Sequence, residues 1–313
     1  MATTLVSPVQ KGGAWLFDTP TQENVFTPDK MTDEHRLIDQ TALEFVTKEI
    51  TPNHDQLETK DWDLARRLLR QAGDLGLLGT DVPETYGGVP LDKVTAAIIA
   101  NRIGQGGSFG SIFGAQTGLV VMPIYTFGTA EQKEHYLPSL VSGKTVGAYC
   151  LSESGSGSDA LGAKTRAVRQ DDGSYILNGE KMWITGMHVA THCAMFARTS
   201  GHNGKPSGIT CFLVPNPTPG LEIEEWMWTF NMPTDHPRLS VNDVWVPDSA
   251  ILGREGGGLA LAQSFVHQNR IRQAASSLGA AQYCIEQSVR YARTRKPFGE
   301  ELAKNQAIQF PLV

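Results

Sequence analysis

The sequence predicts an α+β protein with a helical N-terminal domain, a middle domain of antiparallel strands in a barrel or sandwich, and the start of a C-terminal helical bundle. Three observations lead to this prediction. Apolar residues recur at a helical period over residues 32–140, and short strand-like runs with turn residues between them follow from about residue 147. A helical period then returns after Gly256-Gly257-Gly258. Strands do not alternate with helices, which argues against a parallel α/β sheet.

Four stretches of the first part are expected to be helices. Residues 37–50 and 61–75 each place large apolar side chains on one face, and residues 94–103 are rich in alanine and isoleucine. Pro52 should end the first stretch. Thr129 and Gln132 form a capping-box pattern ahead of a short helix that should stop near Pro138.

From residue 147 the pattern changes to strands. Residues 175–177 and 181–185 flank Asn178-Gly179, a dipeptide typical of a two-residue hairpin turn, so we predict a hairpin there. Because side chains alternate along a strand, Trp183 and Thr185 would share one face. Further strands are expected at residues 192–197, 209–214, 221–228 and 239–246.

The last part is expected to hold one long helix from residue 258 to about 293, with another beginning near Glu300. At 1.5 Å per residue the long helix would measure about 54 Å, and its apolar stripe needs neighbouring helices. The bundle therefore looks unfinished at Val313. The expected domain borders are 1–31 for a leader, then 32–146, 147–252 and 253–313.

Composition narrows the class of protein. With 27 Lys and Arg against 33 Asp and Glu, the net charge is −6, so no nucleic-acid partner is expected. No apolar stretch approaches about 18 residues, so no transmembrane segment is expected, and the N-terminus does not resemble a secretory signal. Four scattered cysteines show no metal-ligand spacing and suggest a reducing compartment, so no metal site is expected.

Residues 149–159 carry the most informative motif. Serine alternates with glycine from Ser154 to Ser158, which predicts a turn with exposed N–H groups and hydroxyls able to hold an anion. The segment lacks the Gly-Lys-Ser/Thr ending of a nucleotide P-loop, and an ordinary surface loop is the alternative interpretation.

Two further sequence features are weaker evidence for a binding site when each is taken alone. The Trp183 indole and the Thr185 hydroxyl could stack on a flat ring and bond its edge, although a core tryptophan beside a surface threonine is the plainer interpretation. Residues 293–299 end the long helix with arginines suited to phosphate, but cations are also expected there to complement the helix dipole.

Taken in order, five segments resemble the acyl-CoA dehydrogenase family of flavoproteins. The resemblance extends over residues 32–313, and leader residues 11–13 and 25–28 resemble its long-chain-acyl branch. The five segments are residues 149–159, 178–185, 243–247 and 295–299 together with Gln306.

The resemblance implies FAD as cofactor and α,β-dehydrogenation of an acyl-CoA thioester, with hydride passing from the β-carbon to flavin N5. Trp183 would lie against the isoalloxazine, with Ile184 and Thr185 at the N5 edge. Arg295 and Gln306 would reach the FAD of a neighbouring subunit in a homodimer or homotetramer. At matching positions the cofactor-binding residues would be Tyr149, Leu151, Ser152, Gly157, Ser158, Trp183, Ile184, Thr185, Arg295 and Gln306, and the substrate-binding residues Ser158 and Arg270.

The sequence departs from the family in three places. Ser154 stands where proline is common, and Pro297 where several relatives carry threonine. The family's catalytic base is a glutamate, in most relatives beyond the point that matches Val313 and in some branches on the long helix, where this chain has Asn269. An amide does not take up a proton at neutral pH, and His267 points to another side of the helix. We therefore expect no catalytic residue here and little activity at this length.

The resemblance also implies an electron-transfer flavoprotein as acceptor, in the cytoplasm of a bacterium or the mitochondrial matrix of a eukaryote. Two alternatives remain open. One is another flavin reaction on the same fold, as in acyl-CoA oxidases or flavin hydroxylases. The other is a non-catalytic binding module, which the intact motifs at residues 149–159 and 183–185 argue against.

Overall fold

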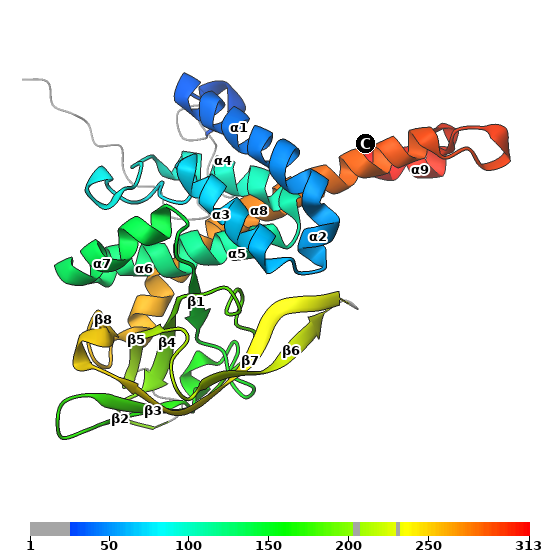
Figure 1. The fold of residues 1–313 in the computed structure, drawn as a ribbon. Helices are drawn as coiled ribbons and strands as arrows, with labels where there is room; N and C mark the ends of the chain where they lie inside the picture. The colour runs from blue at the N-terminus through cyan, green and yellow to red at the C-terminus, as the bar shows by residue number, and fades with distance from the viewer. Residues whose placement is uncertain (1–25, 203–206, 230–231) are drawn as a thin grey trace, which may run out of the picture.

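The computed structural model describes residues 26–202, 207–229 and 232–313. Most of the expected leader, including Lys11-Gly12-Gly13, lies outside the described residues. The described chain forms a group of helices, a β-sheet below them, and a long helix that rises from the sheet, crosses the helical group and projects beyond it (Figure 1). The α+β fold class predicted from the sequence is therefore confirmed. No helix in these ranges combines the length and the apolar character needed to cross a membrane.

The helical part begins with Thr32, which caps α1 through a capping box with His35. The expected capping box at Thr129 and Gln132 is confirmed at the start of α7. The sequence predicted that this helix would stop near Pro138, but the helix continues to Val141. Leu137 and Leu140 are fully buried on either side of the proline, so tertiary packing holds the last turn. The helices are α1 (Asp33–Phe45), α2 (His54–Glu58), α3 (Trp62–Asp74), α4 (Lys93–Ile103), α5 (Phe109–Gly114), α6 (Met122–Phe127) and α7 (Ala130–Val141), with π-helical turns at Val46–Ile50 and Ala115–Val121.

The middle part is one sheet in the order β6-β7-β3-β2-β4-β5-β8, with β1 paired to β4. Neighbouring strands are antiparallel except for β1 with β4 and β2 with β4. The buried aromatic side chains of Tyr175 and Phe212 lie in the core of this sheet, 5.2 Å apart between ring centroids. The strands are β1 (Gly147–Cys150), β2 (Arg166–Arg169), β3 (Tyr175–Lys181), β4 (His192–Arg198), β5 (Ile209–Pro215), β6 (Leu221–Thr229), β7 (Met232–Val246) and β8 (Ile251–Leu252).

The hairpin predicted at Asn178-Gly179 is wrong. Both residues lie inside β3, where the register with β7 shifts and forms a bulge. The Asn178 side chain holds this bulge, because its amide donates to the Asp243 carboxylate and its oxygen accepts from the Asp243 N–H, both at 2.9 Å. The hairpin turn instead lies before β3, at Gly173, where the Gln170 N–H donates to Ser174 across 2.8 Å.

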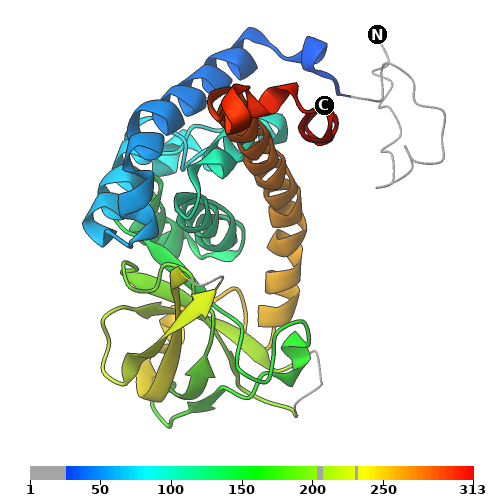
Figure 2. The ribbon, with the colours of Figure 1, turned by 90° about the vertical axis from the view of Figure 1, so that its right-hand side faces the viewer.

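The expected long helix is confirmed as α8 (Gly258–Thr294), which has 37 residues. The helix expected near Glu300 begins later, as α9 (Gln306–Leu312), after two 3-10 turns. An apolar cluster that includes Ile124, Phe196 and Phe265 joins α6, β4 and the first turns of α8. Figure 2 shows α8 running up the side of the molecule from the sheet to α1, so one element spans both parts.

Candidate functional site

The two segments that the sequence singled out lie side by side. The Met182 N–H donates to the Ser152 carbonyl across 2.9 Å, and the Ser154 hydroxyl contacts the Glu180 carboxylate. The serine and glycine loop therefore sits directly beside the end of β3 that leads to Trp183.

A buried ion pair underlies this junction. The Lys181 ammonium lies 2.8 Å from the Glu153 carboxylate and also donates to the Leu151 carbonyl across 3.3 Å. Burial alone would raise the pKa of Glu153, but Lys181 and the N–H groups of Lys164 and Thr165 outweigh it and lower that pKa. Burial lowers the pKa of Lys181, an effect that Glu153 opposes. A buried charge left without its partner is costly, so each side chain holds the other in place.

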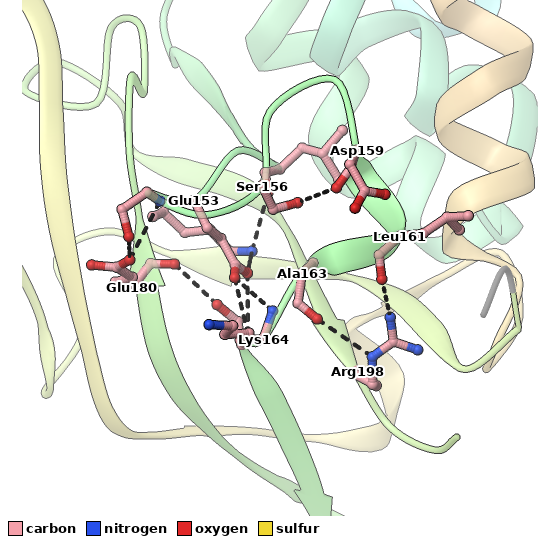
Figure 3. A network of polar contacts seen from close by, with 12 residues as sticks. Glu153, Ser156, Asp159, Leu161, Ala163, Lys164, Glu180 and Arg198 are labelled. Atoms are coloured by element: carbon pink, nitrogen blue, oxygen red, sulfur yellow. Dashed lines mark hydrogen bonds and ion pairs between the residues drawn. The ribbon is translucent and has the colours of Figure 1, made fainter. Parts of the chain in front are cut away.

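The loop after Glu153 presents polar groups to its exterior. Glu153 and Ser156 exchange backbone hydrogen bonds, and the Ser156 hydroxyl donates to the Asp159 carbonyl across 2.7 Å (Figure 3). Within the described part of the chain, no protein acceptor meets the N–H groups of Gly157 and Ser158 or the Ser158 hydroxyl. A Cβ at Gly157 would meet nothing within 4 Å. The loop can thus approach an anionic ligand with its backbone.

Trp183 stands in an unusual backbone conformation. Its φ of +62° is left-handed, which is uncommon for a bulky residue, and its side chain is 43% exposed. This turn ends β3 at Lys181, so the strand expected up to Thr185 stops earlier than predicted. The strain presents an indole at the surface beside Ser152, where it offers a flat face to a ring.

The neighbours of Trp183 divide between surface and core. Thr185 is half-buried and its Oγ1 lies 3.0 Å from His236 Nδ1. The Ile184 side chain is only 1% exposed and packs in the sheet core, so only its backbone is available at the site. The Leu151 side chain is half-buried against the cluster between helices and sheet. The Tyr149 hydroxyl is buried without a partner among the described residues, beside Phe196 and Phe265.

Three further candidates lie on α8, just after it and at the start of α9. Arg270 is exposed on α8, and Arg295 and Gln306 are exposed near the far end of α8 and the start of α9. Figure 1 shows that end of the molecule projecting away from the sheet. Within the described ranges, no hydrogen bond or ion pair joins these three side chains to Trp183 or to the loop at residues 151–158.

Asn269 faces the helical group from α8. Its side chain lies against Gly118 of the π-helical turn Ala115–Val121, beside a cavity of about 40 Å³. The nearby carboxylate of Asp81 is buried and forms ion pairs with both Lys93 and Arg272. The Asp81 carboxylate is therefore engaged by two cationic side chains. The cavity lining includes Leu77, Ala96, Ile99, Ile103, Phe113, Gly114, Thr117 and Asn269.

The residues present fit a flavin dinucleotide. An exposed indole, a buried hydroxyl without a partner at Tyr149, and a loop with free amides at Gly157 and Ser158 lie on connected segments. Sequence reasoning missed His236 and the Lys181–Glu153 pair. His236 is 51 residues from Thr185 and carries no motif signal.

Three family models match the chain. Residues 32–144 match "Acyl-CoA dehydrogenase, N-terminal domain", residues 148–244 match the middle domain, and residues 256–313 match the C-terminal domain. A solved structure of an acyl-CoA dehydrogenase with FAD from Bacillus anthracis superimposes with a TM-score of 0.89 at 37% identity, covering 97% of this chain and 52% of that one.

Two named relatives show how far the similarity extends. A Bacillus subtilis protein named "Probable acyl-CoA dehydrogenase" is 38% identical over 94% of this chain, and the chain spans about half of its length, 49%. The bovine mitochondrial short-chain specific acyl-CoA dehydrogenase is 34% identical over 100% of this chain and 76% of its own length. The bovine relative is named as specific for short-chain acyl groups. This argues against the long-chain-acyl branch that the leader residues led us to expect.

Proposed function

Because this chain belongs to the acyl-CoA dehydrogenase family, we propose that it binds FAD at the junction of residues 151–158 with residues 182–186. We further propose that it acts in the α,β-dehydrogenation of acyl-CoA thioesters. The observation that carries this proposal is the 2.9 Å hydrogen bond from Met182 N–H to the Ser152 carbonyl, which sets the serine and glycine loop beside the Trp183 indole.

In this proposal each polar group has a separate task. The free N–H groups of Gly157 and Ser158 and the Ser158 hydroxyl hold the pyrophosphate, which has acceptor oxygens but no donors. Ser152 and the backbone of Leu151 contact the pyrimidine edge of the flavin. The Trp183 indole covers one face of the ring and keeps water from it. Bound FAD supplies a two-electron hydride acceptor, and the protein supplies position and polarity.

The small cavity beside α8 is the place we propose for the acyl group, whose entry would displace some of the lining side chains. Its walls on α4 and α5 are apolar, with Ile99, Ile103 and Phe113, whereas Asn269 and Arg272 make its α8 side polar. An apolar chain would leave water for this lining at a gain that scales with the area it buries. Arg270 with Ser158 remains the proposed contact for the CoA portion.

The described residues lack a good proton acceptor at the position expected for the base. Asn269 occupies that position, and the adjacent Asp81 carboxylate is bound to Lys93 and Arg272. We therefore propose that these 313 residues bind FAD but oxidise acyl-CoA slowly or not at all. An electron-transfer flavoprotein as acceptor, and a homodimer or homotetramer in which Arg295 and Gln306 reach a neighbouring FAD, belong to the same proposal. So does a location in the bacterial cytoplasm or the mitochondrial matrix.

The test is the visible absorption spectrum of the purified protein during titration with FAD, followed by acyl-CoA thioesters of several lengths. We expect a bound flavin spectrum that acyl-CoA bleaches little, and negligible turnover with a ferrocenium acceptor. A protein that never takes up FAD would contradict the cofactor assignment and favour a binding module. Rapid reoxidation of chemically reduced protein by oxygen would favour an oxidase.

Ser158→Ala should weaken FAD binding about tenfold, because a hydrogen bond to a charged group contributes about 1.5–3 kcal/mol and part of it is kept by the backbone. The measurement is the FAD dissociation constant by fluorescence quenching. Ser277→Ala is the matched control, since that hydroxyl donates to the Gln273 carbonyl of its own helix across 2.9 Å. Equal affinities for the two variants would argue against a phosphate role for Ser158.

A further inference from the structure

The segment that carries Thr185 is held against β7 near residues 236–239. Lys181 pairs with Leu239 at the end of the ladder between β3 and β7. Beyond that ladder the Ile184 N–H donates to the Pro237 carbonyl across 3.2 Å, and Thr185 Oγ1 lies 3.0 Å from His236 Nδ1. The backbone register therefore places the imidazole of His236 beside the Thr185 hydroxyl.

A cluster of three rings, Trp62, His188 and Trp226, lies near this contact, since His236 acts electrostatically on His188. The His188 and Trp62 rings lie 3.4 Å apart between centroids with a tilt of 35°, and the Trp226 ring lies 5.6 Å from His188. Burial, followed by the positive charges of Arg66 and Lys60 and by His236, lowers the pKa of His188 to about 3, so His188 is neutral beside the pair. Since Thr185 and His236 are both half-buried, their hydrogen bond is partly shielded from water, which strengthens it.

The contact limits what the Thr185 hydroxyl can offer to a ligand. A hydroxyl has one hydrogen to donate and two lone pairs. If it donates to His236 Nδ1, it can only accept from a ligand. If Nδ1–H donates to it, its hydrogen is free for a ligand acceptor. An N–H at a ligand edge selects the first arrangement and a bare ring nitrogen selects the second.

We propose that His236 is a positioning residue that fixes the rotamer and the donor or acceptor role of the Thr185 hydroxyl toward the edge of the bound flavin. The proposal rests on the FAD site described above and deepens it. His236 acts through Thr185 and its assigned task is to orient that hydroxyl.

The test compares His236→Leu, His236→Asn, Thr185→Val and the double variant His236→Leu/Thr185→Val after loading with FAD. The readouts are the position and fine structure of the visible flavin band and the FAD dissociation constant. His236→Leu and Thr185→Val should each alter the band in the same way and weaken binding about fivefold to tenfold. The double variant should bind FAD no more weakly than either single variant, because both substitutions disrupt the same hydrogen bond between Thr185 and His236. His236→Asn, which keeps a hydrogen-bonding group, should restore most of the wild-type spectrum, and His202→Leu at an exposed histidine is the control.

A second measurement does not depend on the cofactor. In the protein without FAD, the ¹⁵N resonance of His236 Nδ1 should move on Thr185→Val, and an unchanged resonance would overturn the contact. A wild-type protein that takes up no FAD overturns the proposed function. A protein that takes up FAD normally while His236→Leu leaves both band and affinity unchanged overturns the role of His236 alone.

Discussion

Trp183 combines a strained backbone with an exposed aromatic ring. A left-handed conformation costs a residue with a side chain about 1 kcal/mol, yet the chain places its indole there rather than a glycine. Gly186, three residues later, is also left-handed at φ +75°, so the segment from Trp183 to Gly186 begins and ends with a left-handed residue. A strained conformation persists only where surrounding contacts fix the backbone. Here the Lys181–Glu153 ion pair and the hydrogen bond from Met182 to Ser152 fix the residues just before Trp183.

Trp183→Gly should therefore separate stability from binding. We expect the free energy of unfolding to stay level or rise by up to about 1 kcal/mol, because glycine adopts this φ without strain. FAD affinity should fall about tenfold with the loss of ring stacking. Urea denaturation and FAD titration measure the two effects. Trp245→Ala, at an exposed tryptophan of β7, is the control for affinity, and a Trp183→Gly protein that loses several kcal/mol would show that the indole is structural.

His192 should make the fold sensitive to acid. It is buried, and burial together with the charge of His135 lowers its pKa to about 4 from 6.5. Because the unfolded chain binds a proton that the folded chain does not, stability present above pH 6.5 is lost as the pH falls toward 4. The free energy of unfolding can fall by at most about 3 kcal/mol through this effect, at about 1.4 kcal/mol per unit of pKa difference.

The measurement is the urea midpoint at several pH values for wild type and His192→Gln. The wild-type midpoint should fall more steeply between pH 6.5 and 4 than that of the variant. His267→Gln removes a histidine from the exposed side of α8 and serves as the control. Parallel curves for wild type and His192→Gln would show that His192 does not set this dependence.

At the scale of elements, α8 depends on two close approaches to the helical group. A Cβ at Gly279 would lie 2.7 Å from the Asn101 carbonyl carbon, and a Cβ at Gly104 would lie 2.8 Å from the Ser276 carbonyl carbon. Both glycines permit α4 and α8 to touch through their backbones, so the glycines, rather than large apolar side chains, set this spacing.

Gly279→Ala should lower the free energy of unfolding by about 1–3 kcal/mol, since neither backbone can retreat without moving a helix. Gly114→Ala should instead raise it by up to about 1 kcal/mol, because a Cβ there meets nothing within 4 Å and alanine favours helix. Both values come from urea denaturation. A Gly279→Ala protein as stable as the Gly114→Ala protein would show that the α4–α8 contact yields easily.

At the scale of the whole molecule, α8 carries an apolar stripe that the described chain leaves open. Ile271 and Leu278 are 66% and 67% exposed, and Ile285 and Val289 continue the stripe along the same side of the helix. Together they form an exposed apolar surface of the kind that promotes association.

The 313-residue chain should therefore self-associate in a concentration-dependent manner. Ile271→Glu combined with Leu278→Glu should suppress this, because two carboxylates within the stripe would have to be desolvated. Sedimentation velocity over a wide range of concentrations measures the effect, and Val89→Glu, at an exposed valine of a loop, is the control. A monomer at every concentration with a sharp, reversible melt would contradict the prediction.

The amino-acid sequence by itself determined the order of the three parts, the capping box at Thr129, the length of α8 and the segments that line the proposed site. These depend on periodicity, on side chains that cap their own helix and on motifs that are contiguous in the chain. The sequence misjudged Asn178-Gly179 and the end of β3, because the same dipeptide suits a hairpin turn or a bulge and local preferences do not distinguish the two.

Only the tertiary structure decided which distant groups meet. The Asp243 contact turned Asn178-Gly179 into a bulge, the Lys181–Glu153 pair set the loop beside Trp183, and strand register placed His236 against Thr185. Such contacts join residues 28 to 65 positions apart, and their energies exist only after the chain has closed the loops between them. A local pattern in the sequence holds no record of that closure, which is why the partners of these residues appear only in three dimensions.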